Sequence, residues 1–558
     1  MNAAAIPGTV LLIVAGASVV TWLGSLCVLW RYRLAVERAM GVNARVFAAA
    51  RAAADNERPT LAAVATRMAG DDRLALFRRA AAAPRVEIAC IVVAGLAYAV
   101  VLASALLVAR VEVRTPWRFA LTLWIDSWPI VIAMALSAAS FARTAALATV
   151  AYALFFVVGT LAVIALPDDV PDSAGAMLVT LGDTVTPELM AKFWLVFAAA
   201  PAAVVLLFLN PRLRAVSPLM LAFAMVWIAA LIAAWTAIVA SPFRELPLRL
   251  ADATRGGWAG WLVLGAAFVV GVAASVVAAW LAARWIRSAT LAGTLSDRTL
   301  AIDALFLFYA AFFAMVLSLI DAVWLLAGVL AFVVYRVVVT VARAQVRRRA
   351  VALAPRGLVF LRVFALGEKT STLFSALAKH WRRVGSMQLI AGPDLAQSTA
   401  QPHQLLDFVA GRLSRHFIGD AGGVETAMAA LDRAADRDGW YRVHSFFCRA
   451  DTWQAVLARM VAQGDVVLMD LRSFSVQNAG CEHELRHLVE RVPLGRCVFV
   501  VDRTTDDAHF RALIAATLAD LDAASPNRGV RADALAVHPF TRGAAGLRSL
   551  LRRLCDAG

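Results

Sequence analysis

Two aspartates near the ends of predicted strands have the chemistry of ligand-binding residues. Asp470 lies at the end of the apolar run Val466–Leu471, and Asp502 directly follows Cys497–Val501. Carboxylates in such positions can bind Mg²⁺ or a sugar hydroxyl. They can equally cap a helix or hydrogen-bond to their own loop, and the sequence leaves both interpretations open.

A helix predicted over about 479–491 carries the next candidates. Cys481, Leu485 and Leu488 recur at helical spacing and predict a stripe buried against a sheet. Glu484 lies at the border of this stripe. The solvated face would consist of Glu482, His483, Arg486 and His487.

Metal chemistry finds little support in the sequence. His483 and His487 are four residues apart and could share a metal ion, but no third ligand is apparent. The six cysteines form no CxxC pair and have no metal-ligand spacing, so we expect them to be reduced thiols. We therefore predict no metal site and no bound cofactor.

The elements that would position these residues alternate between strands and helices from about residue 357. The predicted strands are Leu358–Ala365, Met387–Ala391, Val466–Leu471, Cys497–Val501 and Ala534–Val537. The predicted helices are 369–383, 404–415, 452–463, 479–491, 507–521 and 543–555. Nearly continuous apolar strands separated by helices predict a parallel sheet that is covered on both faces, with ligands beyond the carboxyl ends of its strands.

The first 345 residues or so have the composition of a membrane protein. The whole chain is 61% hydrophobic and 17% charged, and its mean hydropathy is +0.73. Nine stretches are long and apolar enough to span a bilayer: about 8–30, 88–109, 119–140, 144–166, 193–210, 218–240, 258–282, 299–320 and 322–342. We predict a transmembrane region over 1–345, a basic linker over 346–356 and a water-soluble domain over 357–558.

The distribution of arginine predicts the orientation of these spans. The net charge of +15 is concentrated in arginines beside hydrophobic segments, a pattern typical of membrane topology and not of nucleic-acid binding. The connection 31–87 is rich in arginine and therefore cytoplasmic, whereas 167–190 is acidic and external. We expect an external N-terminus and a cytoplasmic C-terminal domain. The alanine- and arginine-rich composition is typical of a bacterial inner-membrane protein.

Asp126 is the ionisable residue of most interest within the spans, because a carboxylate is costly there and is a functional candidate by default. It could serve an ion path. Alternatively, it is a structural group that hydrogen-bonds to a neighbouring helix, with the flanking tryptophans at the membrane interface.

The segment 451–485 resembles a TIR domain. Asp451-Thr-Trp-Gln-Ala-Val-Leu-Ala-Arg-Met-Val-Ala-Gln-Gly-Asp-Val-Val-Leu-Met-Asp470 is similar to the helix and strand before the active segment of that family. Ser475 and the spacing Cys481-x-x-Glu484-Leu485 continue the similarity, which covers about 356–558. The resemblance implies a flavodoxin-like α/β parallel-sheet domain, so the fold class is a multi-pass α-helical transmembrane bundle plus this domain. Residues 394–445 would form an insertion.

The resemblance also implies two roles, self-association for signalling and hydrolysis of NAD at its nicotinamide bond. In the second role Glu484 would be the catalytic carboxylate that stabilises positive charge on the ribose. The candidate ligand-binding residues are Phe364, Gly392, Asp394, Trp453, Asp470, Ser475 and Cys481.

We therefore expect a membrane-anchored, TIR-like signalling or immune effector, such as an antiphage protein, that cleaves NAD when its copies cluster in the lipid bilayer. A non-enzymatic sensor or adaptor that binds a nucleotide or a protein is the alternative. A transporter with a regulatory domain is the third possibility. The chain contains no GxGxxG, GxxxxGK[ST], GxSxG or HExxH motif, which argues against kinases, P-loop ATPases, α/β-hydrolases and zincins.

Overall fold

The chain folds into two units, which we call the membrane unit and the C-terminal unit. The computed structural model describes residues 5–41, 70–110, 116–137, 147, 149–158, 161, 191–192, 194–208, 219, 249, 258–318, 320–349, 353–363, 368–391, 402–448 and 452–557. The membrane unit comprises Met1–Val28, Ile88–Ser137 and Phe141–Gln345. The C-terminal unit comprises Leu29–Glu87, Ala138–Ser140 and Val346–Gly558, so it also takes in residues near the N-terminus.

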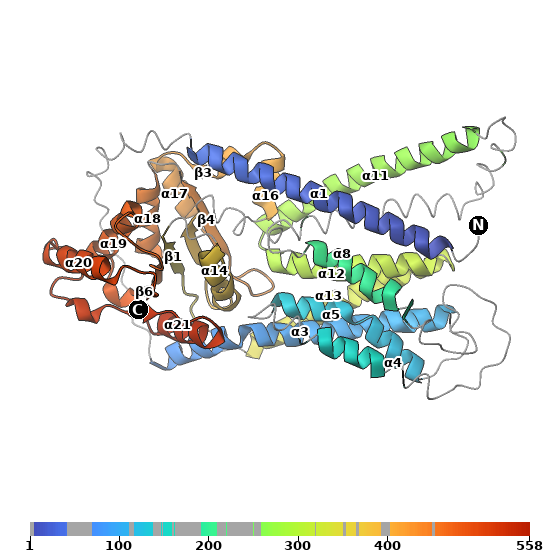
Figure 1. Ribbon diagram of the computed structural model, residues 1–558, viewed down its shortest axis with the longest axis horizontal. Coiled ribbons are helices and arrows are strands. Elements are labelled where there is room, and N and C mark those ends of the chain that lie inside the picture. Colours follow the sequence, from blue (N-terminus) through green and yellow to red (C-terminus); the bar gives the residue numbers. More distant parts are fainter. Residues whose placement is uncertain are drawn as a thin grey trace. The chain divides into compact units, whose positions relative to one another are not determined.

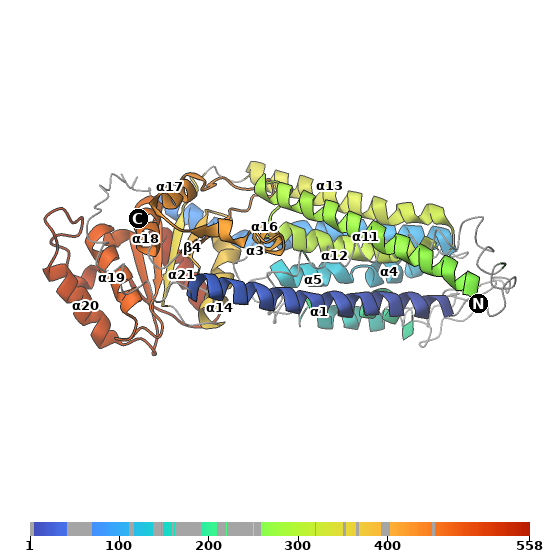
Figure 2. The same cartoon turned by 90° about the horizontal axis from the view of Figure 1, so that it is seen from above.

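Helices make up the described part of the membrane unit. They are α1 (Ala5–Gly41), α3 (Gly70–Arg110), α4 (Pro116–Ile125), α5 (Trp128–Ser137), the π-helix η2 (Leu195–Ala199), α8 (Ala200–Phe208), α11 (Trp258–Leu291), α12 (Asp297–Ser318), the 3₁₀-helix η5 (Ala322–Trp324) and α13 (Leu325–Arg349). Helices α3, α12 and α13 run side by side in two perpendicular views (Figures 1 and 2).

Among the residues that the structure describes, six helical segments are long and apolar enough to cross a membrane, so the chain is a multi-pass membrane protein by the length and composition of its helices. They are Val19–Val36, Asp71–Ala109, Arg118–Ser137, Val269–Leu291, Arg298–Ser318 and Leu325–Arg349. The predicted spans 144–166 and 193–210 contain the shorter apolar helices Thr149–Val158 and Leu195–Leu206. Nearly all of the predicted span 218–240 and of the acidic connection 167–190 lies outside the described residues.

Two helices run well past the spans that the sequence predicts. Helix α1 continues to Gly41, and α3 begins at Gly70. The two ends of the 31–87 connection are therefore continuous with α1 and α3, because alanine and arginine favour helix beyond the apolar stretch. The middle of this connection lies outside the described residues.

The interior of the membrane unit is aromatic and closely packed. Phe306 of α12 stacks on Tyr335 of α13 with ring centroids 4.1 Å apart, and the ring of Tyr98 meets Phe306 edge-on at 5.1 Å. Gly328 allows α13 to approach α12, since a Cβ atom there would lie 2.4 Å from the carbonyl oxygen of Ala310. Small residues permit such close helix contacts in the absence of a hydrophobic driving force.

The C-terminal unit is built on a parallel sheet of seven strands in the order β3-β4-β2-β1-β5-β6-β7. The strands are β1 (Leu358–Arg362), β2 (Met387–Ile390), β3 (Phe417–Ile418), β4 (Val443–Cys448), β5 (Val466–Asp470), β6 (Cys497–Val501) and β7 (Val537–Pro539). The predicted parallel sheet is confirmed. The fifth predicted strand was placed too early, because 532–534 form a 3₁₀-helix and β7 begins at Val537.

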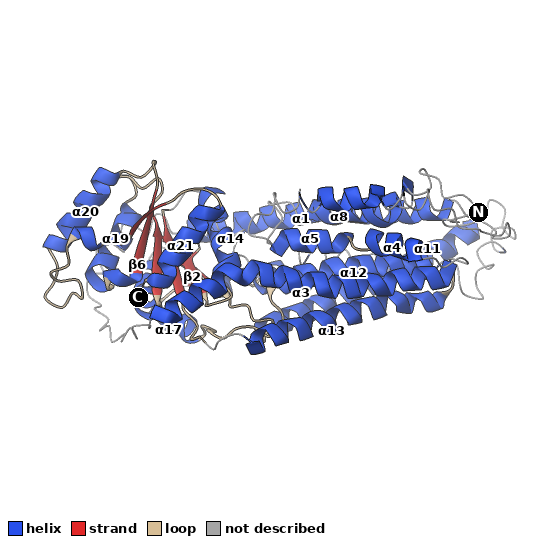
Figure 3. Ribbon diagram, turned by 90° about the horizontal axis from the view of Figure 1, so that it is seen from below, coloured by secondary structure: helices blue, strands red, loops and turns tan. Residues whose placement is uncertain are grey.

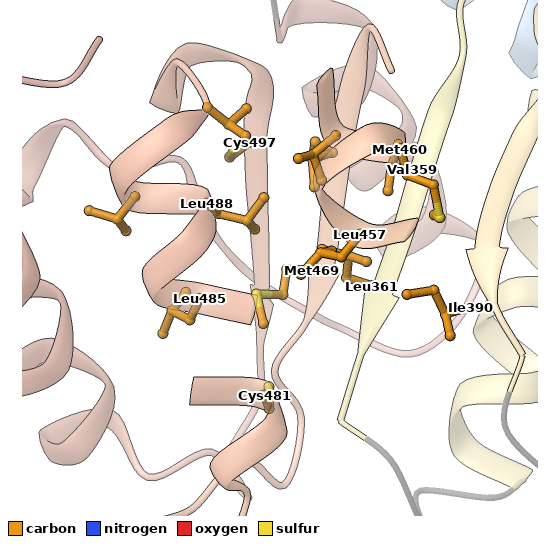
Figure 4. Packing of buried hydrophobic residues seen from close by; sticks show 14 of the residues in the cluster. Val359, Leu361, Ile390, Leu457, Met460, Met469, Cys481, Leu485, Leu488 and Cys497 are labelled. Carbon is orange, nitrogen blue, oxygen red and sulfur yellow. The ribbon is translucent and has the colours of Figure 1, made fainter. Parts of the chain in front are cut away.

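Helices cover both faces of this sheet (Figure 3). They are α14 (Glu368–Trp381), α16 (Pro402–Val409), α17 (Ala421–Ala429), α18 (Trp453–Gln463), α19 (Ala479–Arg491), α20 (Asp507–Ala519) and α21 (Ala544–Asp556). Side chains of α14 and α21 pack with alternate strand residues such as Phe360 and Leu468. Side chains of α18 and α19 pack with the intervening residues, such as Leu361 and Met469 (Figure 4). This alternation follows from the two-residue period of a strand.

The stretch 394–445 contains one predicted element and several that were not predicted. In its described part α16 corresponds to the predicted helix 404–415, whereas β3, α17 and the start of β4 were not predicted. Strands β3 and β4 extend the sheet beyond β2. Without β3 and β4, the remaining strands lie in the order second, first, third, fourth and fifth along the chain. Strand β4 reads Val-His-Ser-Phe-Phe-Cys. Because β4 begins with polar residues, it lacks the continuous apolar run from which a buried strand is predicted.

Both the described end of the predicted linker and the N-terminal end of α3 pack within the C-terminal unit. Arg356 is 7% exposed and donates to the carbonyl oxygen of Ala557 at 2.7 Å. Leu76 and Ala80 of α3 belong to the core beneath α14 and α21. His380 of α14 lies 2.9 Å from the carbonyl oxygen of Ala80 through Nδ1. This end of α3 is thus part of the hydrophobic core that supports the sheet.

Candidate functional site

The carboxyl ends of β1 and β5 meet at the centre of the sheet. Arg362 is the last residue of β1 and is in register with Asp470, the last residue of β5. From β1 the chain proceeds to β2 on one side, whereas β5 lies on the other side. This is the topological switch point of a doubly wound sheet, where such folds bind their ligands.

An ion pair occupies this point. Asp470 is fully buried, and Arg472 holds it in a bidentate pair, with Nε and Nη2 each 2.7 Å from a carboxylate oxygen. Thr370, near the start of α14, donates its hydroxyl to Oδ2 of the same carboxylate at 3.4 Å. The guanidinium of Arg472 also stacks on Phe540, with its Cζ atom 5.0 Å from the centre of the ring. Asp470 therefore forms hydrogen bonds with its own loop, which is one of the two alternatives that the sequence left open.

Glu484 lies on α19, on the other side of β5, and is only 1% exposed. No hydrogen-bond partner reaches its Oε2 atom. Burial raises the pKa of this carboxyl group from 4.5 to about 8, although the positive charge of Arg362 acts to lower it. The group is consequently neutral over most of the physiological pH range.

Helix α19 has the predicted bounds, and its apolar stripe packs on the sheet. Cys481, Leu485 and Leu488 are all at most 2% exposed, and Figure 4 shows them on the side of α19 that faces the core. The expectation that Glu484 lies at the border of this stripe is wrong, because the buried face of α19 is wider than the stripe and includes Glu484. His487 also lies inside the covered part, where desolvation lowers its pKa to about 4.

Cys481 lies near Glu484 and Asp470, but its thiol lacks the features of a reactive cysteine. Its side chain is 2% exposed, and burial together with the charge of Glu484 raises its pKa well above the usual value. A reactive cysteine requires a thiolate in a positively charged, accessible environment. All six cysteines are free thiols, and Cys27 is the exposed one.

Trp453 and Ser475 lie beside this region. Trp453 begins α18 and is half-buried, and its ring meets His483 edge-on with centroids 5.4 Å apart. Ser475 bonds within its own loop, where its hydroxyl lies 3.1 Å from Oδ1 of Asn478. Phe364, Gly392 and Asp394 lie outside the described residues.

The loop after β5 has one unusual backbone conformation. Ser473 adopts a φ of 60°, a left-handed conformation that is uncommon for residues other than glycine. Its amide donates to Thr504 Oγ1 at 3.0 Å, and Thr504 in turn bonds to Asp502. Asp502 therefore also engages its own loop. Non-glycine residues held in such conformations cluster at functional sites.

Sequence reasoning missed Arg362 and Thr370 as members of this site, whereas Arg472 begins the segment beyond the carboxyl end of β5, where ligands were expected. Arg362 interrupts an apolar strand, and a charged residue inside a buried run is a signal that could have identified it. Thr370 carries no such signal, since its role depends on which helix the fold brings to Asp470. The structure thus groups Arg362, Asp470 and Glu484 around the ends of two adjacent strands.

Within the described residues no group of three or more histidine, cysteine or acidic side chains could hold a metal ion. The site instead offers two arginines, one bonded carboxylate and one neutral carboxyl group. Guanidinium groups at the carboxyl ends of strands suit anionic ligands such as phosphates.

Asp126 lies in the membrane unit, apart from this site. Its carboxyl group accepts a hydrogen bond from Tyr309 of α12 at 2.6 Å. The neighbouring Trp128 is 3% exposed and donates to the carbonyl oxygen of Phe197 at 3.1 Å, so it is buried among helices. The position of the flanking tryptophans relative to the membrane interface stays a prediction.

Comparison with protein-family models finds no match for the chain, and comparisons with curated proteins and with solved structures find none either.

Proposed function

We propose that the chain is a membrane-anchored signalling or effector protein whose C-terminal domain binds a nucleotide, with NAD as the substrate. Five of the strands follow the order of flavodoxin-like sheets, which is also the order expected of a TIR-like domain. The site residues lie at the switch point of this order. The similarity of 451–485 to the TIR family adds the identity of the central carboxylate, Glu484.

The observation that carries this proposal is the buried Glu484 with its unpaired oxygen. Leaving a buried polar atom without a partner costs about 1–3 kcal/mol, and natural proteins retain such groups mainly where they have a use. Its raised pKa is typical of a residue in a functional site. A positively charged ligand group, such as the nicotinamide ring of NAD, would draw the carboxyl group toward its ionised form.

In the proposed reaction Glu484 acts as an electrostatic stabiliser. The bond between ribose C1′ and the nicotinamide nitrogen breaks, and its electron pair neutralises the ring. Positive charge develops on the ribose, where an ionised Glu484 stabilises it. Water then adds to C1′ and loses a proton to solvent. Arg362 and Arg472 are the residues that would attract the phosphates.

The site is closed in this structure, because Glu484 is 1% exposed. Binding therefore requires an opening, and we propose that clustering of copies in the membrane provides it. Helix α3 is suited to transmit such a signal, since one helix contains both an apolar span and the core residue Leu76. In this proposal the membrane is the bacterial inner membrane, with the C-terminal domain in the cytoplasm.

The complete burial of Glu484 also supports a second function, that of a non-enzymatic sensor or adaptor. A carboxyl group that remains neutral and enclosed is a structural element of the core. The domain would then bind a nucleotide or a protein through its helices without chemistry. Consumption of NAD separates the two functions.

The experiment uses the full chain in lipid nanodiscs, with and without a fused dimerisation domain that forces clustering. NAD consumption and nicotinamide release are measured for the wild type, Glu484→Gln and Glu490→Gln. Glu490 lies on the same helix but is partly exposed, so it is the matched control. The enzymatic proposal expects turnover on clustering that Glu484→Gln abolishes and Glu490→Gln preserves. If no clustered form consumes NAD, the sensor or adaptor function replaces it.

A further inference from the structure

The apolar segment Arg118–Ser137 of the membrane unit is interrupted in its middle. Helix α4 ends at Ile125 and α5 begins at Trp128, with a turn over Asp126–Ser127 between them. Irregular backbone at membrane depth is tolerated only where protein or water satisfies its polar groups. Here Tyr152 donates its hydroxyl to the carbonyl oxygen of Ile125 at 2.9 Å. The interruption is therefore supported by side chains and leaves Asp126 at its centre.

Asp126 is 1% exposed, and only one of its two carboxyl oxygens has a hydrogen-bond partner. Its Oδ1 atom accepts from the hydroxyl of Tyr309 at 2.6 Å, whereas Oδ2 has no hydrogen-bond partner. No ion pair joins it to any residue that the structure describes. An ionised carboxylate in the interior of a membrane helix is energetically costly. A neutral carboxyl group avoids this cost.

The groups that face Asp126 come from several elements, and the titratable ones are tyrosines. They are Tyr98 of α3, Tyr152 of the helix Thr149–Val158 and Tyr309 of α12. Among the described residues, no arginine, lysine, histidine or other carboxylate acts electrostatically on Asp126. A hard metal cation would require about six oxygen ligands. A lone carboxyl group with one unpaired oxygen suits a proton instead.

A π-helix adjoins the same place. Trp128, directly after the turn, donates from its indole nitrogen to the carbonyl oxygen of Phe197 in η2 at 3.1 Å. The ring of Trp128 also meets Tyr309 edge-on, with centroids 5.1 Å apart. Single-turn π-helices occur frequently at functional sites, because they re-aim backbone groups within a helix. The π-helix therefore contacts the residue that directly follows the turn over Asp126–Ser127.

We propose that Asp126 is a proton-binding site inside the membrane unit. The proton resides on Oδ2, and Oδ1 accepts the hydrogen bond from Tyr309. Release of this proton to water leaves a carboxylate without a counter-charge among the described residues, which disfavours the closed packing around Tyr98, Trp128 and Tyr309. Protonation of Asp126 therefore favours the closed packing, and the closed packing in turn favours protonation.

The test is infrared spectroscopy of the full chain in lipid nanodiscs, which detects the carbonyl stretch of a neutral carboxyl group. All proteins carry Glu484→Gln, since the buried Glu484 would contribute a similar band. Asp126→Asn is compared with Asp303→Asn, the matched control. Asp303 is also in the membrane unit but is paired with Arg336 at 2.5 Å. The proposal expects a neutral-carboxyl band at neutral pH that shifts in D₂O, is lost in Asp126→Asn and remains in Asp303→Asn.

Tyr309→Phe is the second variant, and it keeps the test decisive if Asp126→Asn does not fold. Loss of the hydrogen bond to Oδ1 should move the band to higher frequency without removing it. The proposal is overturned if the parent protein has no such band at neutral pH. It is also overturned if the band survives in folded Asp126→Asn, or if it does not move in folded Tyr309→Phe.

Discussion

Glu484 makes the stability of the C-terminal unit depend on pH, and the substitution Glu484→Gln should remove that dependence. The pKa of the carboxyl group is about 8 in the folded chain against an ordinary 4.5. The unfolded chain therefore loses this proton at lower pH than the folded chain does. The stability that the neutral group contributes is fully present below about pH 4.5 and is lost as the pH rises through about 8.

The size of the effect follows from the same two values. Between pH 6 and pH 8, a group with these pKa values lowers the free energy of unfolding by about 2 kcal/mol, which is roughly a thirtyfold change in the opening equilibrium. Glutamine has nearly the same shape and no charge to gain. The variant should therefore show only the pH dependence that the remaining groups produce.

Amide hydrogen exchange measured by mass spectrometry on the full chain reports this opening. The relevant peptides are those of β5, β6 and α19, after correction for the intrinsic pH dependence of exchange. Protection in the wild type should fall from pH 6 to pH 8 relative to Glu484→Gln, while Glu490→Gln should follow the wild type. Equal pH dependence in the wild type and Glu484→Gln would refute the argument, because it would mean that the carboxyl group is solvated in the folded chain.

Three further substitutions test the packing that supports the site. Asp470→Ala should destabilise the C-terminal unit by about 3–5 kcal/mol, because it removes the carboxylate that forms the bidentate ion pair with the buried Arg472; adding Arg472→Met should restore much of the loss. Gly464→Ala should cost about 1–3 kcal/mol, since its Cβ would lie 2.4 Å from a side chain of β1, whereas Gly495→Ala meets no atom within 4 Å and should be tolerated. Leu76→Ala should cost about 2–5 kcal/mol and expose the amides of α21 to exchange. Unchanged exchange of the α21 amides in Leu76→Ala would contradict the placement of α3 in that core.

The sequence predicts the elements of the C-terminal unit where they are apolar. The strand Cys497–Val501 and the helix 479–491 have the predicted bounds, because each is a continuous apolar run or a clear helical stripe. The polar start of β4 and the two-residue strand β3 carry no such pattern. Only the hydrogen bonds to neighbouring strands reveal them.

The site could be predicted only in part, for a similar reason. The resemblance of Cys481-x-x-Glu484-Leu485 to the TIR family points to Glu484, but the burial of this residue depends on the tertiary packing around α19. The pairing of Asp470 with Arg472 depends on the course of a loop, which local periodicity does not encode. In the membrane unit, the turn at Asp126 interrupts a segment whose hydropathy is uniformly high, so a span of 119–140 was expected to be one helix.

The two edges of the sheet limit how copies of the protein can associate. Strand β3 offers only Phe417–Ile418 at one edge, and β7 offers Val537–Pro539 at the other, where Pro539 has no amide hydrogen to donate. Edges this short provide too few free backbone groups to recruit a strand from a neighbouring molecule. Crowding of the domain on a membrane therefore does not extend one sheet into the next. Any ordered assembly of the C-terminal unit has to be built from contacts between helices and loops, which side-chain substitutions can disrupt without damage to the sheet.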